Sequence, residues 1–102
     1  MNKLKFLTQE QVESLIDSIP AVGERNLRDR AIIQVLWTTG LRLAELLSLP
    51  EAPFAREGLK SLELSIVGKM QWRRMIYFSP ATIKMIKAYL AERESDSLEL
   101  FD

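Results

Sequence analysis

The sequence predicts a mostly helical α+β fold, with helices packed around a small antiparallel β-sheet made of one hairpin. The first observation is a helical period of apolar residues in four segments, 8–19, 26–39, 41–49 and 80–93. The second is a pair of alternating, β-prone runs within residues 61–78. The third is a hydrophobic content of 47% in 102 residues, which suffices for the core of one modest domain.

The helix at 8–19 has clear start and stop signals. Thr8 can accept a hydrogen bond at the N-cap, and Gln11 stands three residues later, so the two are spaced as a capping box. Pro20 cannot continue a helix and should end this one.

The segment 26–39 is apolar almost all round, so we expect a central helix that is buried on most sides. Asn26 can cap its first turn. Gly40 can adopt the left-handed backbone that ends a helix. The apolar period then restarts and predicts a short helix at 41–49.

Arg42 follows this break directly, and Glu45 lies three residues later. On a helix the two side chains would share one face, where they could form a structural ion pair. Alternatively, an arginine held at the corner between two apolar helices could recognise a phosphate. The local sequence leaves both interpretations open.

The predicted hairpin at 61–78 carries basic residues at its tip and flanks, namely Lys69, Arg73 and Arg74. Such charges can contact a polyanion, but they also protect exposed strand edges from aggregation. Charge alone does not separate these interpretations.

Ser79-Pro80 is typical of a helix start, with an N-cap followed by proline at the first helical position. We expect Tyr89, on the apolar face of that helix, to belong to the core. Residues 98–101 are apolar enough to begin another strand, so Phe101 is expected in a third strand.

The chain contains no cysteine and no histidine, which excludes disulfides, thiolate metal sites and histidine general bases. We therefore predict no metal and no cofactor. The formal net charge is zero, but residues 92–102 hold five acids and one base, which leaves thirteen bases and nine acids elsewhere. A mildly basic body permits DNA binding. Neither a signal peptide nor a membrane-spanning run is evident, so a cytoplasmic location is expected.

The order of these motifs resembles the first half of the catalytic domain of the tyrosine recombinases, the phage integrase and Xer-type family. The resemblance spans nearly the whole chain, and we expect residues 1–102 to form part of that domain. It depends on a capped first helix and on three later motifs in order: Thr39-Gly40-Leu41-Arg42 with Glu45-Leu46, then Gly68-Lys69 at a hairpin, then Phe78-Ser79-Pro80.

The resemblance implies a site-specific recombinase that cuts and rejoins double-stranded DNA through a tyrosine linked to a 3′ phosphate, as a homotetramer on DNA. Arg42 matches the arginine that contacts the scissile phosphate, a role that suits a planar, permanently charged fork. Lys69 matches the hairpin lysine that protonates the leaving 5′ oxygen. Glu45 matches an acid that steadies the arginine. Three further residues are expected to contact DNA: Thr39, Arg73 and Arg74.

The chain also departs from the family pattern. Many members have Gly-Lys-Gly-x-Lys-x-Arg at the hairpin, whereas Met70 and Trp72 replace the second glycine and the second lysine here. The chain has no His-x-x-Arg motif, and Tyr77 and Tyr89 fall in the wrong places for the nucleophile. We therefore expect a catalytic domain truncated at its C-terminal end, inactive alone.

Two other classes of function fit parts of the sequence. A non-enzymatic winged-helix module would place the helix at 41–49 in the major groove of DNA and use the basic hairpin as its wing. That helix, however, has few polar side chains to read base edges. A protein-interaction domain without a nucleic-acid role would fit the zero net charge and the acidic end.

Overall fold

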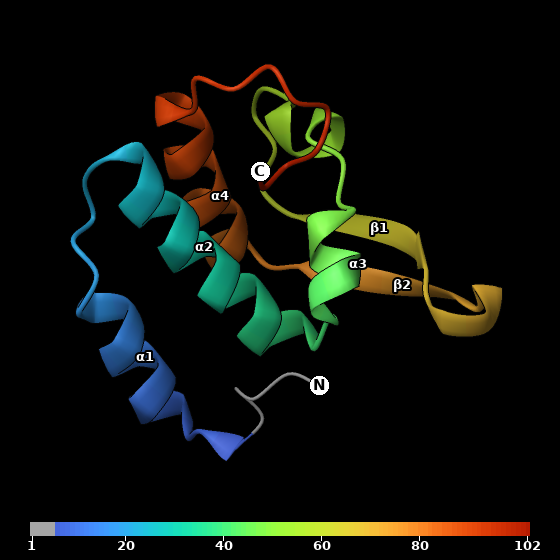
Figure 1. Ribbon diagram of the computed structural model, residues 1–102, viewed down its shortest axis with the longest axis horizontal. Helices are drawn as coiled ribbons and strands as arrows, with labels where there is room; N and C mark the ends of the chain where they lie inside the picture. The colour runs from blue at the N-terminus through green and yellow to red at the C-terminus, as the bar shows by residue number, and fades with distance from the viewer. Residues whose placement is uncertain (1–5) are drawn as a thin grey trace.

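The computed structural model describes residues 6–102 and shows four helices around one antiparallel hairpin, as the sequence predicts (Figure 1). The hairpin projects from the helices, and its strands pair in register from Leu62 with Phe78 to Val67 with Arg73. Two short 3-10 turns, η2 and η3, lie before and within the hairpin. The element bounds are α1 Gln9–Asp17, α2 Glu24–Thr39, α3 Leu43–Leu47, η2 Ala52–Ala55, β1 Leu62–Val67, η3 Lys69–Gln71, β2 Arg73–Phe78 and α4 Pro80–Glu92.

The capping box at the start of α1 is confirmed. The backbone N–H of Gln11 donates to the Thr8 hydroxyl at 3.1 Å, and the backbone N–H of Thr8 donates to the Gln11 side chain at 2.8 Å. At the other end of α1, the Arg30 guanidinium donates to the carbonyls of Ile16 and Ile19 at 2.8 and 2.7 Å. These bonds use carbonyls near the helix end and attach α1 to α2.

Two expectations about α2 were wrong. The helix begins at Glu24, with Gly23 at the N-cap, and the Asn26 side chain donates to the Val22 carbonyl instead of capping the helix. Only Ala31 and Val35 are fully buried on α2. The helix is covered on the side that packs against α4 (Figure 1), and its other apolar side chains stay partly exposed.

The core is built around aromatic side chains from four different segments. The rings of Phe54 and Phe78 meet edge to face with their centroids 5.0 Å apart, and those of Tyr89 and Phe101 stack at 5.6 Å. Tyr89 is a core residue, as expected, and its hydroxyl donates to the carbonyl of Leu100 at 3.0 Å. Burial raises the pKa of Tyr89 above its ordinary 10.0, so the hydroxyl keeps its proton.

The C-terminal segment does not supply a third strand to the hairpin, which corrects the expectation for Phe101. The segment pairs instead with the chain that follows α3, through one isolated bridge between Pro50 and Glu99. The backbone N–H of Leu100 donates to Leu49 at 2.8 Å, and that of Glu51 donates to Leu98 at 2.9 Å.

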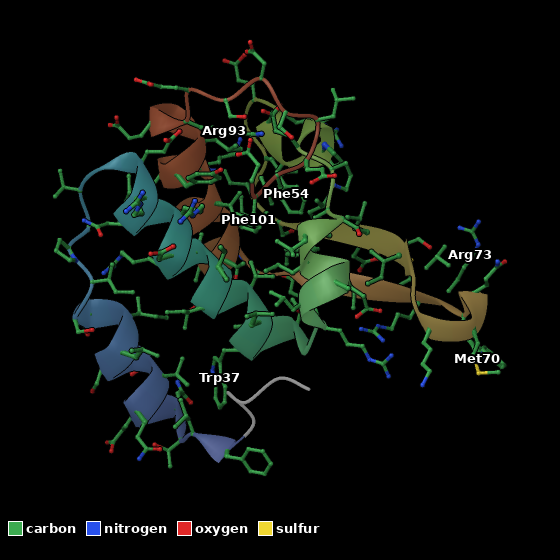
Figure 2. The ribbon with its side chains drawn as sticks, viewed as in Figure 1. Trp37, Phe54, Met70, Arg73, Arg93 and Phe101 are labelled. Carbon is green, nitrogen blue, oxygen red and sulfur yellow. The ribbon has the colours of Figure 1, made fainter. Side chains whose placement is uncertain are left out.

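Arg93 holds this arrangement together. Figure 2 labels Arg93 just beyond α4. Its side chain is only 2% exposed. It forms an ion pair with Glu51 at 2.7 Å and donates to the carbonyls of Ser97 and Glu99 at 2.8 and 2.6 Å. A buried guanidinium needs several acceptors. Glu51 and the returning segment provide them for the two Nη atoms of Arg93, whereas its Nε has no partner among the described residues.

The hairpin tip has an unusual backbone. Met70 and Gln71 both adopt positive φ angles, 60° and 61°, a region that side chains with a Cβ rarely occupy. The tip is closed by a hydrogen bond from the Gly68 N–H to the Trp72 carbonyl at 2.8 Å. The bulky residues at the tip are therefore accommodated at the expense of local strain.

Replacing Met70 with glycine is expected to stabilise the fold by roughly 0.5–1 kcal/mol, because glycine reaches positive φ without a Cβ clash. Urea denaturation of the full chain would measure the change. Met75→Gly is the matched control, since Met75 is also exposed but lies in a regular strand, where glycine should destabilise. The same sign for both variants would contradict strain at Met70.

Candidate functional site

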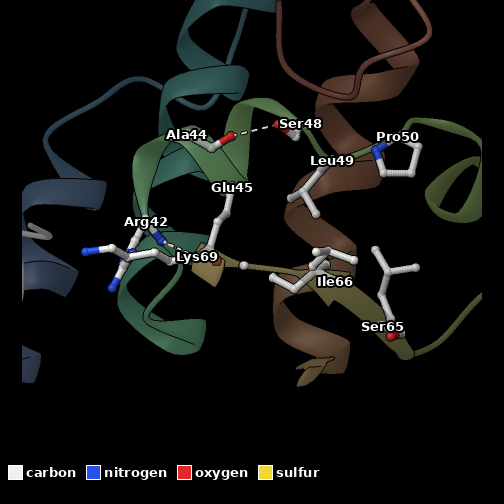
Figure 3. A pocket seen from close by; sticks show the side chains of 12 residues that line it. Arg42, Ala44, Glu45, Ser48, Leu49, Pro50, Ser65, Ile66 and Lys69 are labelled. Atoms are coloured by element: carbon white, nitrogen blue, oxygen red, sulfur yellow. Dashed lines mark hydrogen bonds between the residues drawn. The ribbon is translucent and has the colours of Figure 1, made fainter. Parts of the chain in front are cut away.

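A cleft of about 560 Å³ lies between α3 and the hairpin, and three of the sequence-predicted site residues line it (Figure 3). Arg42 and Glu45 reach it from the start of α3, and Lys69 reaches it from the turn after β1. The remaining lining is mostly apolar or small and consists of Ala44, Ser48, Leu49, Pro50, Leu64, Ser65, Ile66, Val67 and Gly68.

The corner before Arg42 is set by a glycine and a threonine. Gly40 has a φ of 69°, the left-handed conformation that the sequence predicts, and its N–H donates to Leu36 at 3.1 Å. The Thr39 hydroxyl donates to the Val35 carbonyl at 2.6 Å and accepts the N–H of Leu41 at 3.3 Å. Thr39 thus shapes the corner from which Arg42 projects.

Arg42 is not part of α3, which corrects the expected helix at 41–49. The helix comprises only Leu43–Leu47, and Arg42 is its N-cap residue, with an extended backbone at φ −74° and ψ 154°. Arg42 and Glu45 therefore do not share a helix face. An ion pair between their side chains, one of the two interpretations that the local sequence leaves open, is absent from the contacts of residues 6–102.

Glu45 instead holds the backbone of Arg42 and the side chain of a different arginine. Its Oε1 accepts the Arg42 backbone N–H at 2.9 Å and the Nη2 of Arg74 at 2.8 Å (Figure 3 shows the first bond). The Glu45 side chain is only 9% exposed, whereas the Arg74 side chain is 44% exposed, so the pair lies at the edge of the cleft with its carboxylate on the inner side. The carboxylate ties the corner of α3 to the hairpin.

The second oxygen of Glu45 lies against the backbone of Gly68. Oε2 is buried and has no hydrogen-bond partner among the described residues. A Cβ added to Gly68 would lie only 2.7 Å from this oxygen, closer than real Cβ contacts come. Only glycine therefore lets the hairpin approach Glu45 this closely, directly beside Lys69.

The two arginines of β2 lie on opposite faces of the hairpin. Arg74 shares the face of the buried residues Ile76 and Phe78, and it pairs with Glu45. Arg73 lies on the outer face, away from the core.

The cleft presents free positive charge. Among residues 6–102, neither the Arg42 guanidinium nor the Lys69 amine forms a hydrogen bond or an ion pair, and the same holds for Arg73. The one carboxylate in the cleft is already paired with Arg74. Two unpaired cations at a concave surface favour binding of an anion such as a phosphate group.

Local patterns could not reveal the Arg74 partner or the role of Gly68. The sequence suggests a partnership between Glu45 and Arg42 because they are three residues apart, whereas Arg74 is 29 residues away from Glu45. Only the packing of the hairpin on α3 brings the second pair together.

The model of the phage integrase family matches residues 5–101. Tyrosine recombinase XerD of Rhizobium meliloti is 36% identical over 107 residues, covering 95% of this chain and 33% of that protein. Tyrosine recombinase XerC of Staphylococcus saprophyticus is 30% identical over 86 residues, covering 84% of this chain and 28% of that protein.

Two solved structures of XerH site-specific recombinase have the same fold. The post-cleavage complex with palindromic difH substrate superposes with a TM-score of 0.73 at 27% identity, covering 94% of this chain and 29% of that one. The pre-cleavage complex with difH gives a TM-score of 0.70. The chain thus spans about three-tenths of the length of the relatives it matches. None of the helices within residues 6–102 has the length and apolar character of a membrane span.

Proposed function

This chain belongs to the phage integrase family, and we propose that it forms part of the catalytic domain of a tyrosine recombinase. Such an enzyme cleaves and rejoins double-stranded DNA through a 3′-phosphotyrosine intermediate. The observation that carries the proposal is the cleft between α3 and the hairpin, in which Arg42 and Lys69 are both free of partners among the described residues. The proposed domain comprises residues 1–102, of which the first five lie outside the described residues.

In this proposal Arg42 binds the scissile phosphate. Its fork can donate two hydrogen bonds to the non-bridging oxygens and stabilise the charge that grows on them in the transition state. Glu45 is a positioning residue, because it holds the Arg42 backbone and, through Arg74, the hairpin.

Lys69 supplies the proton in the cleavage step. A deprotonated tyrosine oxygen attacks phosphorus, the bond from phosphorus to the 5′ oxygen breaks, and the Lys69 ammonium gives its proton to that leaving oxygen. Neither tyrosine of the described structure suits the attack. Tyr89 is buried against Leu100, and Tyr77 lies on the outer face of the hairpin. The nucleophile in this proposal comes from another segment, and the 102 residues alone are expected to be inactive.

Double-stranded DNA is the proposed partner. The two XerH structures are complexes with a DNA substrate, and the cleft offers two unpaired cations beside one carboxylate, Glu45, which is paired with Arg74. Arg73 adds a charge on the outer face of the hairpin. A homotetramer on DNA in the cytoplasm is proposed from the family alone, and the proposed roles need neither a metal nor a cofactor.

The winged-helix alternative is not favoured. The helix that would enter the major groove has only five residues, of which Leu46 is buried and Leu43 and Leu47 are apolar. Such a surface has few groups that can read base edges. The family match also points to recombination and not to a winged helix.

The proposed function is tested by Lys69→Ala in a recombinase that contains this chain. Loss of the general acid is expected to slow DNA cleavage by about 10²–10⁴-fold. A substrate with sulfur in place of the bridging 5′ oxygen should restore the rate, because a thiolate leaves without protonation. Single-turnover cleavage of both substrates is the measurement.

Lys60→Ala is the matched control, since Lys60 is exposed and lies before β1 outside the cleft. It should cleave both substrates at the unmodified rate. A Lys69→Ala variant that stays slow on the sulfur substrate would contradict the acid role and reduce Lys69 to a phosphate contact.

A further inference from the structure

The hairpin tip displays two large apolar side chains to solvent. Met70 is 81% exposed and Trp72 is 74% exposed, and both lie within the loop that also carries Lys69 (Figure 2 labels Met70 at the tip). We propose that Trp72, supported by Met70, is a wedge that packs against the bases of duplex DNA beside the phosphate bound in the cleft. This inference depends on the proposed function, because it takes DNA as the partner.

The wedge is held by an ordered backbone. The N–H of Gly68 donates to the Trp72 carbonyl at 2.8 Å, and the N–H of Trp72 donates to the Lys69 carbonyl at 3.4 Å. At the base of the loop, the ion pair between Arg74 and Glu45 ties the hairpin to α3. A fixed tip loses little conformational entropy when it binds, so the exposed side chains of Met70 and Trp72 can contact a partner at a small entropic cost.

The positive charges around the hairpin tip favour a polyanion as the binding partner. Within the hairpin, from Leu64 to Phe78, the sequence contains three bases and no acid. The bases nearest the wedge are Lys69, which precedes Met70, and Arg73, which follows Trp72, and neither side chain has a partner among the described residues. An apolar contact surrounded by unpaired cations fits DNA, where phosphates flank the stacked bases. A second copy of this chain would bring the same positive charge to the contact.

The position of the wedge determines which base step of the DNA it can contact. Met70 follows Lys69 directly, so a phosphate bound by Lys69 would place the tip beside the neighbouring base step. Apolar side chains enter the minor groove by partly unstacking such a step, and pyrimidine–purine steps unstack most easily. The wedge is therefore expected to favour DNA with flexible steps next to the bound phosphate.

The direct test uses the chain's own tryptophans. The sequence has two, Trp37 and Trp72, so Trp37→Phe leaves Trp72 as the only indole. Titration of this variant of the 102-residue chain with a mixed-sequence DNA duplex should quench Trp72 emission, because the ring stacks on bases. The remaining emission of Trp72→Ala, which comes from Trp37 in α2, should not change.

The affinity for duplex DNA distinguishes a stacking contact of Trp72 from a phosphate contact of Arg73. Trp72→Ala is expected to weaken duplex binding about tenfold at every salt concentration, with an unchanged salt slope. Arg73→Ala should instead lower the salt slope by about one, as the loss of a phosphate contact does. Leu98→Ala is the matched control, since Leu98 is 88% exposed but lies in the C-terminal segment away from the tip, and it should bind normally.

Several outcomes would overturn the wedge. Salt-sensitive binding without Trp72 quenching, and with full affinity in Trp72→Ala, would do so while leaving the proposed function intact. Self-association in sedimentation that Trp72→Ala abolishes would assign the tip to a second copy. A complete lack of DNA affinity would also overturn the wedge, and the Lys69 rescue experiment would then decide the proposed function separately.

Discussion

Arg42→Ala is expected to lower the rate of DNA cleavage by about 10³-fold or more in a recombinase that contains this chain. The guanidinium is exposed at the start of α3 and has no protein partner among residues 6–102, so its proposed task is contact with the phosphate. Much of the DNA affinity should remain, because many other phosphate contacts share it. Single-turnover cleavage and salt-dependent binding measure the two effects.

The fold should tolerate this change, and the free energy of unfolding should stay within about 0.5 kcal/mol of the original. Arg42→Lys keeps the positive charge but loses the bidentate hydrogen bonding of the guanidinium, so it should recover only part of the cleavage rate. Arg25→Ala removes an exposed arginine from the first turn of α2 and should leave cleavage unaffected. Full cleavage by Arg42→Ala would contradict the assignment of Arg42.

Gly68→Ala is expected to disrupt the cleft without removing any charged group. The new Cβ would meet Glu45 Oε2 at 2.7 Å, so the carboxylate or the hairpin must move. Displacement by about 1 Å at a catalytic site can lower the rate by about 10²-fold, and overpacking costs about 1–3 kcal/mol of stability. Cleavage kinetics and denaturant unfolding measure both.

A double-mutant cycle identifies the cause. If the Cβ acts by colliding with Glu45, then Gly68→Ala should add little to Glu45→Ala in either measurement. Two additive effects would show that Gly68 and Glu45 act independently. The cycle thus tests the contact that links Arg42 to the hairpin.

The elements with strong local signals could be predicted from the sequence. The capping box at Thr8, the left-handed Gly40 and the Ser79 cap satisfy backbone groups within a few residues, so short windows reveal them. The period of two in residues 61–78 also predicts the two strands of the hairpin. These signals determined the fold class and the order of the candidate site residues.

Where local signals are weak, the prediction was less accurate. The sequence pattern extended α3 to nine residues, whereas the helix has five, because the apolar period continues through residues that lie outside the helix. The apolar end of the chain was assigned to a third strand. Arg93 and the carbonyls beside it place that segment against Pro50 instead.

By itself, the sequence determined the helices, the hairpin and the residues that match the family motifs, since each depends on neighbours along the chain. Tertiary structure alone decided which groups meet. Glu45 binds Arg74 and lies against Gly68 because the hairpin packs on α3. Since Glu45 pairs with Arg74 and holds only the backbone of Arg42, the Arg42 guanidinium has no partner among residues 6–102. Contacts between distant segments depend on how the helices and strands pack together, and the local spacing of apolar residues carries no information about that packing.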